Sequence, residues 1–447
     1  MFLLRRNFVN ATALSVSFLS PCLIAAEDDL QQQINQLKAQ VSALEAKLLE
    51  QQQEEQQQKQ QAAQQDAQQE AQQKQSEAQQ AALEEKPDTT TEKTDGITVG
   101  GAIRTNFSYT SYSEGNEDRG GDFDFDIFRF DFKGSIGAVS LNAEIRFYDY
   151  MTAVKSAYVG YQFTDLWQVQ AGIAQVPFGN LPYNSHNYFF STNYYLGLED
   201  DHDLGLVFKR TLSDNWQLDL GFFKNDELGG IDGYVDSRAD RYSYDVVGYR
   251  LTGDGIYDDP AQPLGEYNTF TGRFAYVIEH SPGFTTELGV SGLSGGLHDD
   301  TDRAGSYSAW ALHLNSHYER WNLQLEHGEY DYDVADAVQM AVGAYAFYDS
   351  IAAQATTSTI NLAYSLPVVW GPVTGLQLYN NYGLIYDKAD GTRDTMMNVT
   401  GVSVSAGALF TYFDLVHARN QPFVGGSIAG DSDETERRFN INIGYYF

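Results

Sequence analysis

The feature that most constrains this chain is a two-residue alternation of apolar and other side chains, which recurs from about residue 97 to the last residue. In its final run the apolar members are Phe439, Ile441, Ile443, Tyr445 and Phe447. A period of two places successive side chains on opposite faces of a β-strand. One face of this strand therefore suits lipid, and the other suits water.

Upstream runs carry charges on the face that is not apolar. Glu144 and Arg146 interrupt an apolar series at 139–147, and Asp219 does so at 216–222. A dry protein core excludes such charges, whereas a water-filled lumen permits them. The mean hydropathy of -0.40 agrees with a barrel, because its strands average out near neutral. Beyond the N-terminal region, no apolar stretch is long enough for a helical span. The predicted fold class is therefore an all-β transmembrane barrel.

The alternating runs predict sixteen antiparallel strands. They start near residues 97, 122, 138, 153, 166, 203, 215, 268, 284, 306, 321, 355, 373, 396, 408 and 437. Short connections alternate with long ones along the chain, and only Asp149–Thr152 is a short member of the long class. Membrane barrels show this alternation between short periplasmic turns and longer outer loops. An even number of strands places both ends of the barrel on the periplasmic side.

The region before the barrel has a different composition. Its first segment holds Arg5 and Arg6 and then an Ala-, Leu- and Ser-rich stretch, which is typical of a secretory signal peptide. Cys22 is the single cysteine, and Pro21 before it makes a lipid-attachment site a poor fit. Cleavage near Ala26 removes that cysteine, so we expect a mature chain without disulfides.

A heptad pattern follows the signal peptide. Its apolar positions are Leu30, Ile34, Leu37, Val41, Leu44 and Leu48. This spacing predicts an α-helical coiled coil, although Gln predominates beyond Leu48 and a frayed polar spacer is an equal alternative. Pro87 ends the helical pattern. The predicted domains are a signal peptide (1–26), a periplasmic coiled-coil and Gln-rich stalk (27–86), a linker (87–96) and an outer-membrane β-barrel (97–447).

Three segments resemble the phosphate-selective porin O and P family of Gram-negative bacteria. They are Val169–Gly179, Asp203–Leu206 and Asp126–Gly134. The resemblance implies a 16-stranded outer-membrane porin, a homotrimer, with its third outer loop folded inward. The final strand also resembles the assembly signal of outer-membrane barrels, so we expect the barrel assembly machinery and lipopolysaccharide as partners. The coiled coil departs from the simplest members of the family.

The third outer loop, predicted at Gln175–His202, is the candidate constriction. It is rich in aromatic residues, and folding into the lumen would bury its rings and narrow the pore. Packing over the rim or against neighbouring subunits is the alternative. The candidate constriction residues are Pro177, Phe178, Tyr183, His186, Tyr188 and Tyr194.

The phasing of the strands places charges of both signs on the lumen face. The candidate pore-lining residues are Arg104, Asp124, Asp126, Arg129, Asp131, Lys133, Glu144, Arg146, Lys209, Asp219, Arg273 and Arg438. A phosphate channel needs a ladder of basic side chains, whereas scattered, compensating charges are usual in a lumen. The predicted barrel also has a formal charge of -26, which disfavours anions. We therefore expect an acidic porin that is not phosphate-selective.

Other functional classes have weaker support. The formal charge of -33 argues against nucleic-acid binding. No nucleophile motif appears, so we expect no enzyme and no catalytic residues. The outer acidic runs at 199–203, Asp258-Asp259 and 431–434 offer oxygen ligands for Ca²⁺ or Mg²⁺. None has the spacing of a calcium loop, so the sequence favours a solvated acidic surface without cofactors.

The predicted function is passive diffusion of small hydrophilic solutes or ions through an outer-membrane porin. A structural tether, with the coiled coil bound to peptidoglycan, is the alternative from another class. A phosphate-selective channel, or a sugar-selective channel that uses the loop tyrosines as a stacking surface, is the third option.

Overall fold

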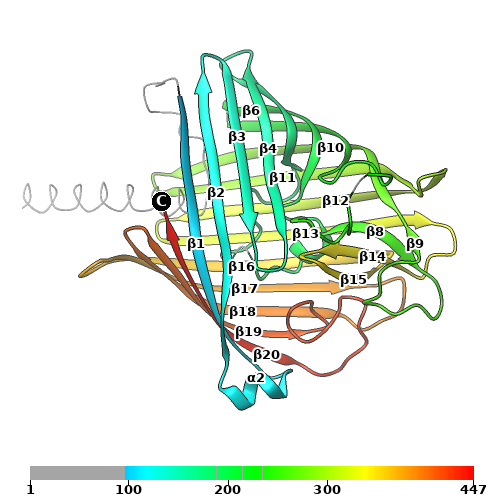
Figure 1. Cartoon of the computed structure of the whole chain (residues 1–447). Helices are drawn as coiled ribbons and strands as arrows, with labels where there is room; N and C mark the ends of the chain where they lie inside the picture. The colour runs from blue at the N-terminus through cyan, green and yellow to red at the C-terminus, as the bar shows by residue number, and fades with distance from the viewer. Residues whose placement is uncertain (1–95, 188, 214, 234) are drawn as a thin grey trace, which may run out of the picture. The chain divides into compact units, whose positions relative to one another are not determined.

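The computed structural model describes residues 96–447, except residues 188, 214 and 234. The predicted signal peptide, coiled-coil stalk and nearly all of the linker lie outside the described residues. The described part folds as a closed barrel of sixteen antiparallel strands, which confirms the predicted fold class for this region (Figure 1). Within that part, no helix combines the length and the apolar character that crossing a membrane requires.

The barrel strands follow one another in chain order. The first eight are β1 (Gly96–Thr110), β2 (Asp122–Ile136), β3 (Val139–Phe147), β4 (Thr152–Gln162), β5 (Trp167–Gln175), β6 (His202–Ser213), β7 (Trp216–Asp226) and β10 (Gly265–Ser281). The second eight are β11 (Phe284–His298), β12 (Arg303–Tyr318), β13 (Trp321–Val334), β16 (Gln354–Trp370), β17 (Val373–Tyr386), β18 (Thr395–Ala406), β19 (Leu409–Arg419) and β20 (Glu436–Tyr446). Pairing of β20 with β1 closes the barrel, with Ala102 opposite Tyr446 and Thr110 opposite Arg438. Each predicted strand start lies within three residues of the observed one.

The connections at one end of the barrel are two to four residues long, and most of those at the other end are longer. We call the second set the outer loops. The fifth outer loop corrects the prediction that Asp149–Thr152 is the single short outer connection. We expected a long loop at 294–305, but β11 ends at His298 and β12 begins at Arg303, which leaves only 299–302. Gly295 and Gly296 lie in β11 under the rings of Tyr307 and Tyr267, which a Cβ atom would meet. The glycines therefore make room for aromatic rings within β11.

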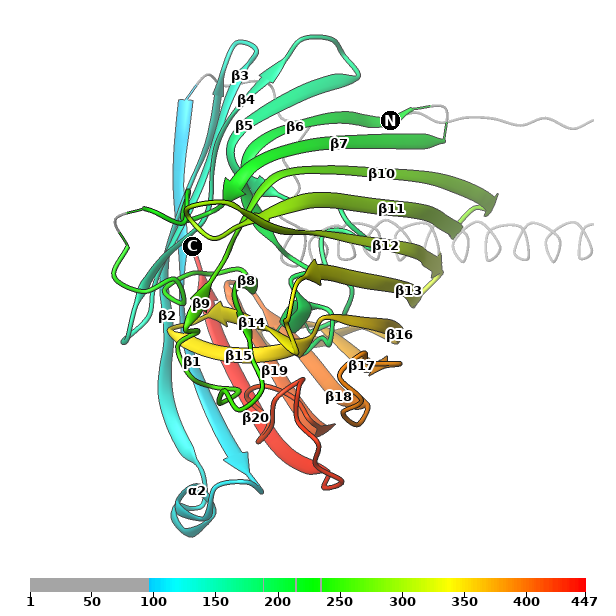
Figure 2. The same ribbon diagram turned by 90° about the vertical axis from the view of Figure 1, so that its right-hand side faces the viewer.

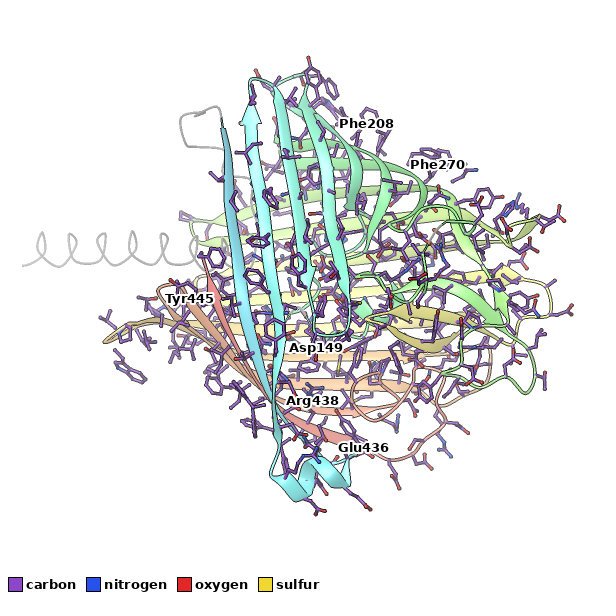
Figure 3. All side chains as sticks on the ribbon, viewed as in Figure 1. Asp149, Phe208, Phe270, Glu436, Arg438 and Tyr445 are labelled. Atoms are coloured by element: carbon purple, nitrogen blue, oxygen red, sulfur yellow. The ribbon has the colours of Figure 1, made fainter. Side chains whose placement is uncertain are left out.

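The two faces of the barrel wall differ as the alternation requires. Phe208 on β6, Phe270 on β10 and Tyr445 on β20 are exposed, and Phe208 and Phe270 project away from the barrel (Figure 3). Charged side chains such as Arg273 and Glu326 are buried on the inner side. An apolar outer face and a polar inner face are what a membrane barrel requires.

Two outer loops form a second sheet that the sequence analysis did not predict. Its strands are β8 (Asp245–Arg250), β9 (Gln262–Pro263), β14 (Gln339–Ala344) and β15 (Phe347–Ala352), in the order β15-β14-β8-β9. They belong to the fourth outer loop (227–264) and the sixth (335–353), and β8, β14 and β15 lie inside the curve of the barrel strands (Figure 2). These strands are short, almost fully buried and without polar alternation, so the period-two signal does not reveal them.

Two short helical segments complete the described elements. Helix α2 (Glu114–Arg119) lies in the first outer loop, where the Ser113 side chain accepts a hydrogen bond from the Asn116 backbone and Gly120 ends the helix in the left-handed region. The 3-10 turn η1 (Tyr194–Leu196) lies in the third outer loop and is buried.

Candidate functional site

The third outer loop spans residues 176–201 and lies inside the barrel. Its first part is held by β10, where the Thr271 hydroxyl donates to the Pro177 carbonyl (3.1 Å) and the Arg273 Nε donates to the Gly179 carbonyl (2.7 Å). Next, the Asn180 backbone N–H donates to the Glu326 carboxylate on β13 (2.7 Å). The loop therefore starts along one inner wall.

The middle of the third outer loop continues around the wall. Asn184 Nδ2 donates to the Thr359 hydroxyl on β16 (2.8 Å), and the His186 backbone N–H donates to the Asn381 side chain on β17 (3.3 Å). Asn187 Nδ2 then donates to the Asp414 carboxylate on β19 (2.6 Å). Buried polar groups of the loop thus find partners on the inner faces of these strands, as burial requires.

The candidate constriction residues have different surroundings. Pro177, Phe178, His186 and Tyr194 are buried, and Tyr183 is partly buried with its hydroxyl 3.3 Å from Lys155 Nζ. Tyr188 lies outside the described residues. Among the five described candidates, Tyr194 lines the cavity described next, whereas Phe178 packs in the hydrophobic core.

A cavity of about 240 Å³ lies between the third outer loop and the wall of β1–β3, β19 and β20. Its polar lining comes from Asn187 of the third outer loop and from eight residues of the barrel strands: Arg104, Asn106, Asp124, Asp126, Arg146, Arg438, Asn440 and Asn442. Its aromatic lining comes mostly from five outer loops: Phe125, Tyr148, Tyr150, Phe189, Phe190, Tyr194, Tyr242, Tyr345, Tyr412 and Phe423. Phe189, Phe190 and the residues of the fourth and sixth loops were not among the predicted site residues, because alternation does not place loop side chains.

Arginines on the cavity wall have acidic neighbours. Arg104 Nε lies 2.9 Å from an Asp126 carboxylate oxygen, and Arg146 Nε lies 2.5 Å from one of Glu144. Arg438, labelled on β20 in Figure 3, hydrogen-bonds the Asn440 side chain and has its guanidinium 5.5 Å from the Phe190 ring. The wall is therefore a set of paired charges more than a ladder of cations.

The structure brings together only some of the candidate pore-lining residues. Those that line the cavity are Arg104, Asp124, Asp126, Arg146 and Arg438. Arg129 pairs with Asp131 at 2.7 Å, and its second nitrogen lies 3.9 Å from Glu144. The remaining four do not line this cavity: Lys133 on β2, Lys209 on β6, Asp219 on β7 and Arg273 on β10.

Lys209 and Asp219 lie opposite each other in the register of β6 and β7. Arg273 is almost fully buried, forms an ion pair with Glu287 (2.5 Å) and holds the backbone of the third outer loop. Arg273 was predicted to line the pore, and the structure shows that it instead positions the third outer loop.

The acidic run at 199–203 differs from the solvated surface that we expected. Glu199, Asp200, Asp201, His202 and Asp203 are all buried. The fourth outer loop contacts this run, since the Tyr242 hydroxyl donates to Asp200 and the His202 backbone N–H donates to the Ser243 hydroxyl. Burial raises the pKa of Glu199 to about 8, although this carboxyl accepts hydrogen bonds from the Asn184 backbone and the Ser191 hydroxyl. The acidic runs at 258–259 and 431–434 are exposed, as predicted.

Comparisons with known proteins give a consistent result. Residues 97–252 match the family model of the phosphate-selective porin O and P family. The matched range, 97–252, includes all three motifs that carried the resemblance. No curated protein matches the chain.

Solved structures show the same kind of barrel. The outer membrane channel DcaP of Acinetobacter baumannii is 11% identical, with a TM-score of 0.50 over 80% of this chain and 99% of that chain. OmpF of Salmonella typhi, solved with daunomycin, is also 11% identical, with a TM-score of 0.52 over 79% of this chain and 98% of that chain. At this identity the likeness shows the fold alone.

The partial family match and the closed barrel together support the porin family, an outer-membrane location in Gram-negative bacteria and a channel for small solutes. They favour a channel over an enzyme.

Proposed function

We propose that this chain is an outer-membrane porin through which small hydrophilic solutes and ions diffuse passively, without preference for phosphate. The single observation that carries the proposal is the cavity of about 240 Å³, which is bounded by polar barrel strands and by a loop folded inside the closed barrel. Width and charge at such a narrowing filter solutes in channels.

The absence of phosphate preference follows from the charges around this cavity. Of the three arginines on its wall, Arg104 forms an ion pair with Asp126 (2.9 Å) and Arg146 forms one with Glu144 (2.5 Å). Arg438 hydrogen-bonds the Asn440 side chain, and Asp124 adds a further carboxylate to the lining. A phosphate site needs basic groups that are free to replace the water around the anion. Arginines already paired with carboxylates attract phosphate weakly, and the acidic balance of the whole barrel lowers anion entry further.

The test is the reversal potential of the purified protein in a planar bilayer across a KCl gradient, followed by addition of phosphate. We expect a weak preference for cations and no block by phosphate. Strong anion preference with block at low phosphate would refute the selectivity, and no conductance at all would refute the channel.

A sugar-selective channel is a second candidate, which the aromatic lining of the same cavity favours. Aromatic faces bind the apolar faces of sugar rings, and Tyr148 and Tyr150 already form a stacked pair with centroids 5.5 Å apart. In this case neutral sugars should block the current, and Tyr150→Ala should weaken the block. Tyr257→Ala is the matched control, because Tyr257 is similarly exposed but does not line the cavity.

The homotrimer is part of this proposal and rests on the family resemblance. The tether to peptidoglycan stays a prediction about residues outside the described part, and deletion of residues 27–86 with measurement of envelope integrity tests it.

A further inference from the structure

Four carboxyl side chains converge near the outer ends of β6 and β10. Asp201 ends the third outer loop, Asp203 lies on β6, Asp245 begins β8, and Glu266 lies on β10. One carboxylate oxygen from each of the three aspartates lies within 4.8 Å of the other two. All four side chains are more than nine-tenths buried.

A small cavity of about 20 Å³ adjoins these carboxyl groups. This volume accommodates one particle the size of a water molecule. The rings of Tyr244, Tyr307 and Tyr330 form part of its wall. The hydroxyl of Tyr307 donates a hydrogen bond to Glu266. Carboxyl groups and tyrosine rings therefore make up much of the wall of this cavity.

The charges around this cavity are unbalanced. Arg238 pairs with Asp226, and Arg241 pairs with Asp226, Glu227 and Asp245. In the part of the chain that the structure describes, no basic side chain forms an ion pair with Asp201, Asp203 or Glu266.

Hydrogen bonds compensate these three carboxyls only in part. Tyr307 donates a hydrogen bond to Glu266, but one buried oxygen each of Asp201 and Asp203 has no partner. Burying carboxylates that are neither paired nor hydrogen-bonded is costly, so a compensating positive charge is expected.

We propose that Asp201, Asp203 and Asp245, with Glu266 beside them, bind one divalent cation. Two ligand atoms on opposite sides of a Ca²⁺ ion are about 5 Å apart, which the spacing of the three aspartate oxygens allows. Ca²⁺ accepts irregular sets of oxygen ligands, whereas Mg²⁺ requires near-ideal octahedral geometry. Ca²⁺ is therefore the ion that fits this set of side chains.

Such an ion would join three parts of the molecule. Asp201 belongs to the third outer loop, Asp245 to the sheet of the fourth and sixth loops, and Asp203 and Glu266 to the barrel wall. Binding would hold the loops against the wall. This inference does not depend on which solute crosses the barrel.

The experiment uses the purified full chain after treatment with EDTA. Calcium is titrated while binding stoichiometry and the unfolding temperature are measured, and Tb³⁺ is used as a second probe because nearby tyrosines sensitise its emission. We expect one tight Ca²⁺ per chain, a higher unfolding temperature with Ca²⁺, and tyrosine-sensitised Tb³⁺ emission that Ca²⁺ displaces.

Asp203→Asn and Asp201→Asn should each abolish the tight binding and the sensitised emission, in protein that still migrates as a folded barrel on an unheated gel. Asp431→Asn, at an exposed acidic position, is the matched control and should bind as the unmodified chain does. Absence of saturable binding to the unmodified chain would overturn the proposal and indicate carboxyls that hold protons. Unchanged binding in both variants would place the ion elsewhere and overturn it equally.

Discussion

The two sides of the barrel interior neutralise their charges differently. On the wall of β1–β3, Arg104 has Asp126 and Arg146 has Glu144 as acidic partner. At the fourth outer loop, by contrast, six carboxyls lie close to one another: Asp201, Asp203, Asp226, Glu227, Asp245 and Glu266. Arg238 and Arg241 form ion pairs with three of them. Ion pairs of this kind suit a wall next to water, because no unpaired positive or negative charge remains to bind a passing ion tightly. An excess of buried carboxylates suits a structural anchor that needs a cation.

The largest expected effect comes from removing Arg241, the centre of the second region. Its side chain is fully buried and pairs with Asp226, Glu227 and Asp245. Arg241→Met leaves three buried carboxylates with one basic neighbour, and breaking such a network costs about 3–5 kcal/mol. We expect loss of hydrogen-exchange protection in β8 and β14.

The control for this change is Arg393→Met. Arg393 pairs with Asp431 and Asp433 on the surface, with half of its side chain exposed. Exposed pairs contribute about 0–1 kcal/mol, so protection should hardly change. Equal losses in the two variants would mean that burial does not distinguish the two kinds of pair.

The difference between the wall of β1–β3 and the carboxyl cluster also explains which side-chain positions the sequence predicted. The wall was predictable because alternation fixes the face of each residue, so Arg104, Asp126 and Arg146 were placed inside from their positions alone. The position of each of these side chains depends only on its own strand and the strand paired with it.

The carboxyl cluster was not predictable in this way, because Asp201, Asp203, Asp245 and Glu266 come from separate segments whose approach depends on loop packing. One signal was available: the apolar run Val338–Phe347 is too hydrophobic for a solvated loop. Such a run indicates a buried loop but not the partner against which it packs.

The second prediction concerns pH and Glu199. The pKa of this carboxyl is raised by burial to about 8, above its ordinary value near 4.5. The folded state therefore binds this proton more tightly than the unfolded state, and the stability of the loop falls as pH rises from about 4.5 to about 8. The loss builds up over this range, because the folded state keeps a proton that the unfolded state has released, and it stops growing above about pH 8.

Glu199→Gln should remove this part of the pH dependence. The measurement is the hydrogen-exchange protection of residues 189–198 at pH 6 and pH 9. The unmodified chain should lose protection at the higher pH, and the variant should lose less. If both lose protection equally, Glu199 is not the titrating group.

The third prediction tests the contact between the third outer loop and Asp414 on β19. Asp414 accepts hydrogen bonds from Asn187 Nδ2 (2.6 Å) and the Tyr379 hydroxyl (2.5 Å). Asp414→Ala leaves the buried Tyr379 hydroxyl without its acceptor and Asn187 Nδ2 with only the long hydrogen bond to that hydroxyl (3.5 Å), at a cost of about 1–3 kcal/mol. We expect noisier single-channel currents, because the loop segment that borders the cavity loses its anchor. Asp414→Asn keeps an acceptor for one donor and should be milder, whereas quiet currents in both variants would show that other contacts suffice.

The smallest expected effect comes from unbalancing the wall itself. Asp126→Asn removes the acidic partner of Arg104 while keeping the size of the side chain, so one arginine beside the cavity becomes available to anions. One unit charge at about 4 Å in water changes an ion's free energy by about 1 kcal/mol, which corresponds to roughly a fivefold change in permeability ratio. The reversal potential should move toward anions, and high salt should reduce the shift because it screens exposed charges. Asp258→Asn, at an exposed position of the fourth outer loop, removes the same charge away from the cavity and should leave the reversal potential nearly unchanged. If the two variants behave alike, the overall acidity of the barrel sets its selectivity and the pairing of charges on the wall does not.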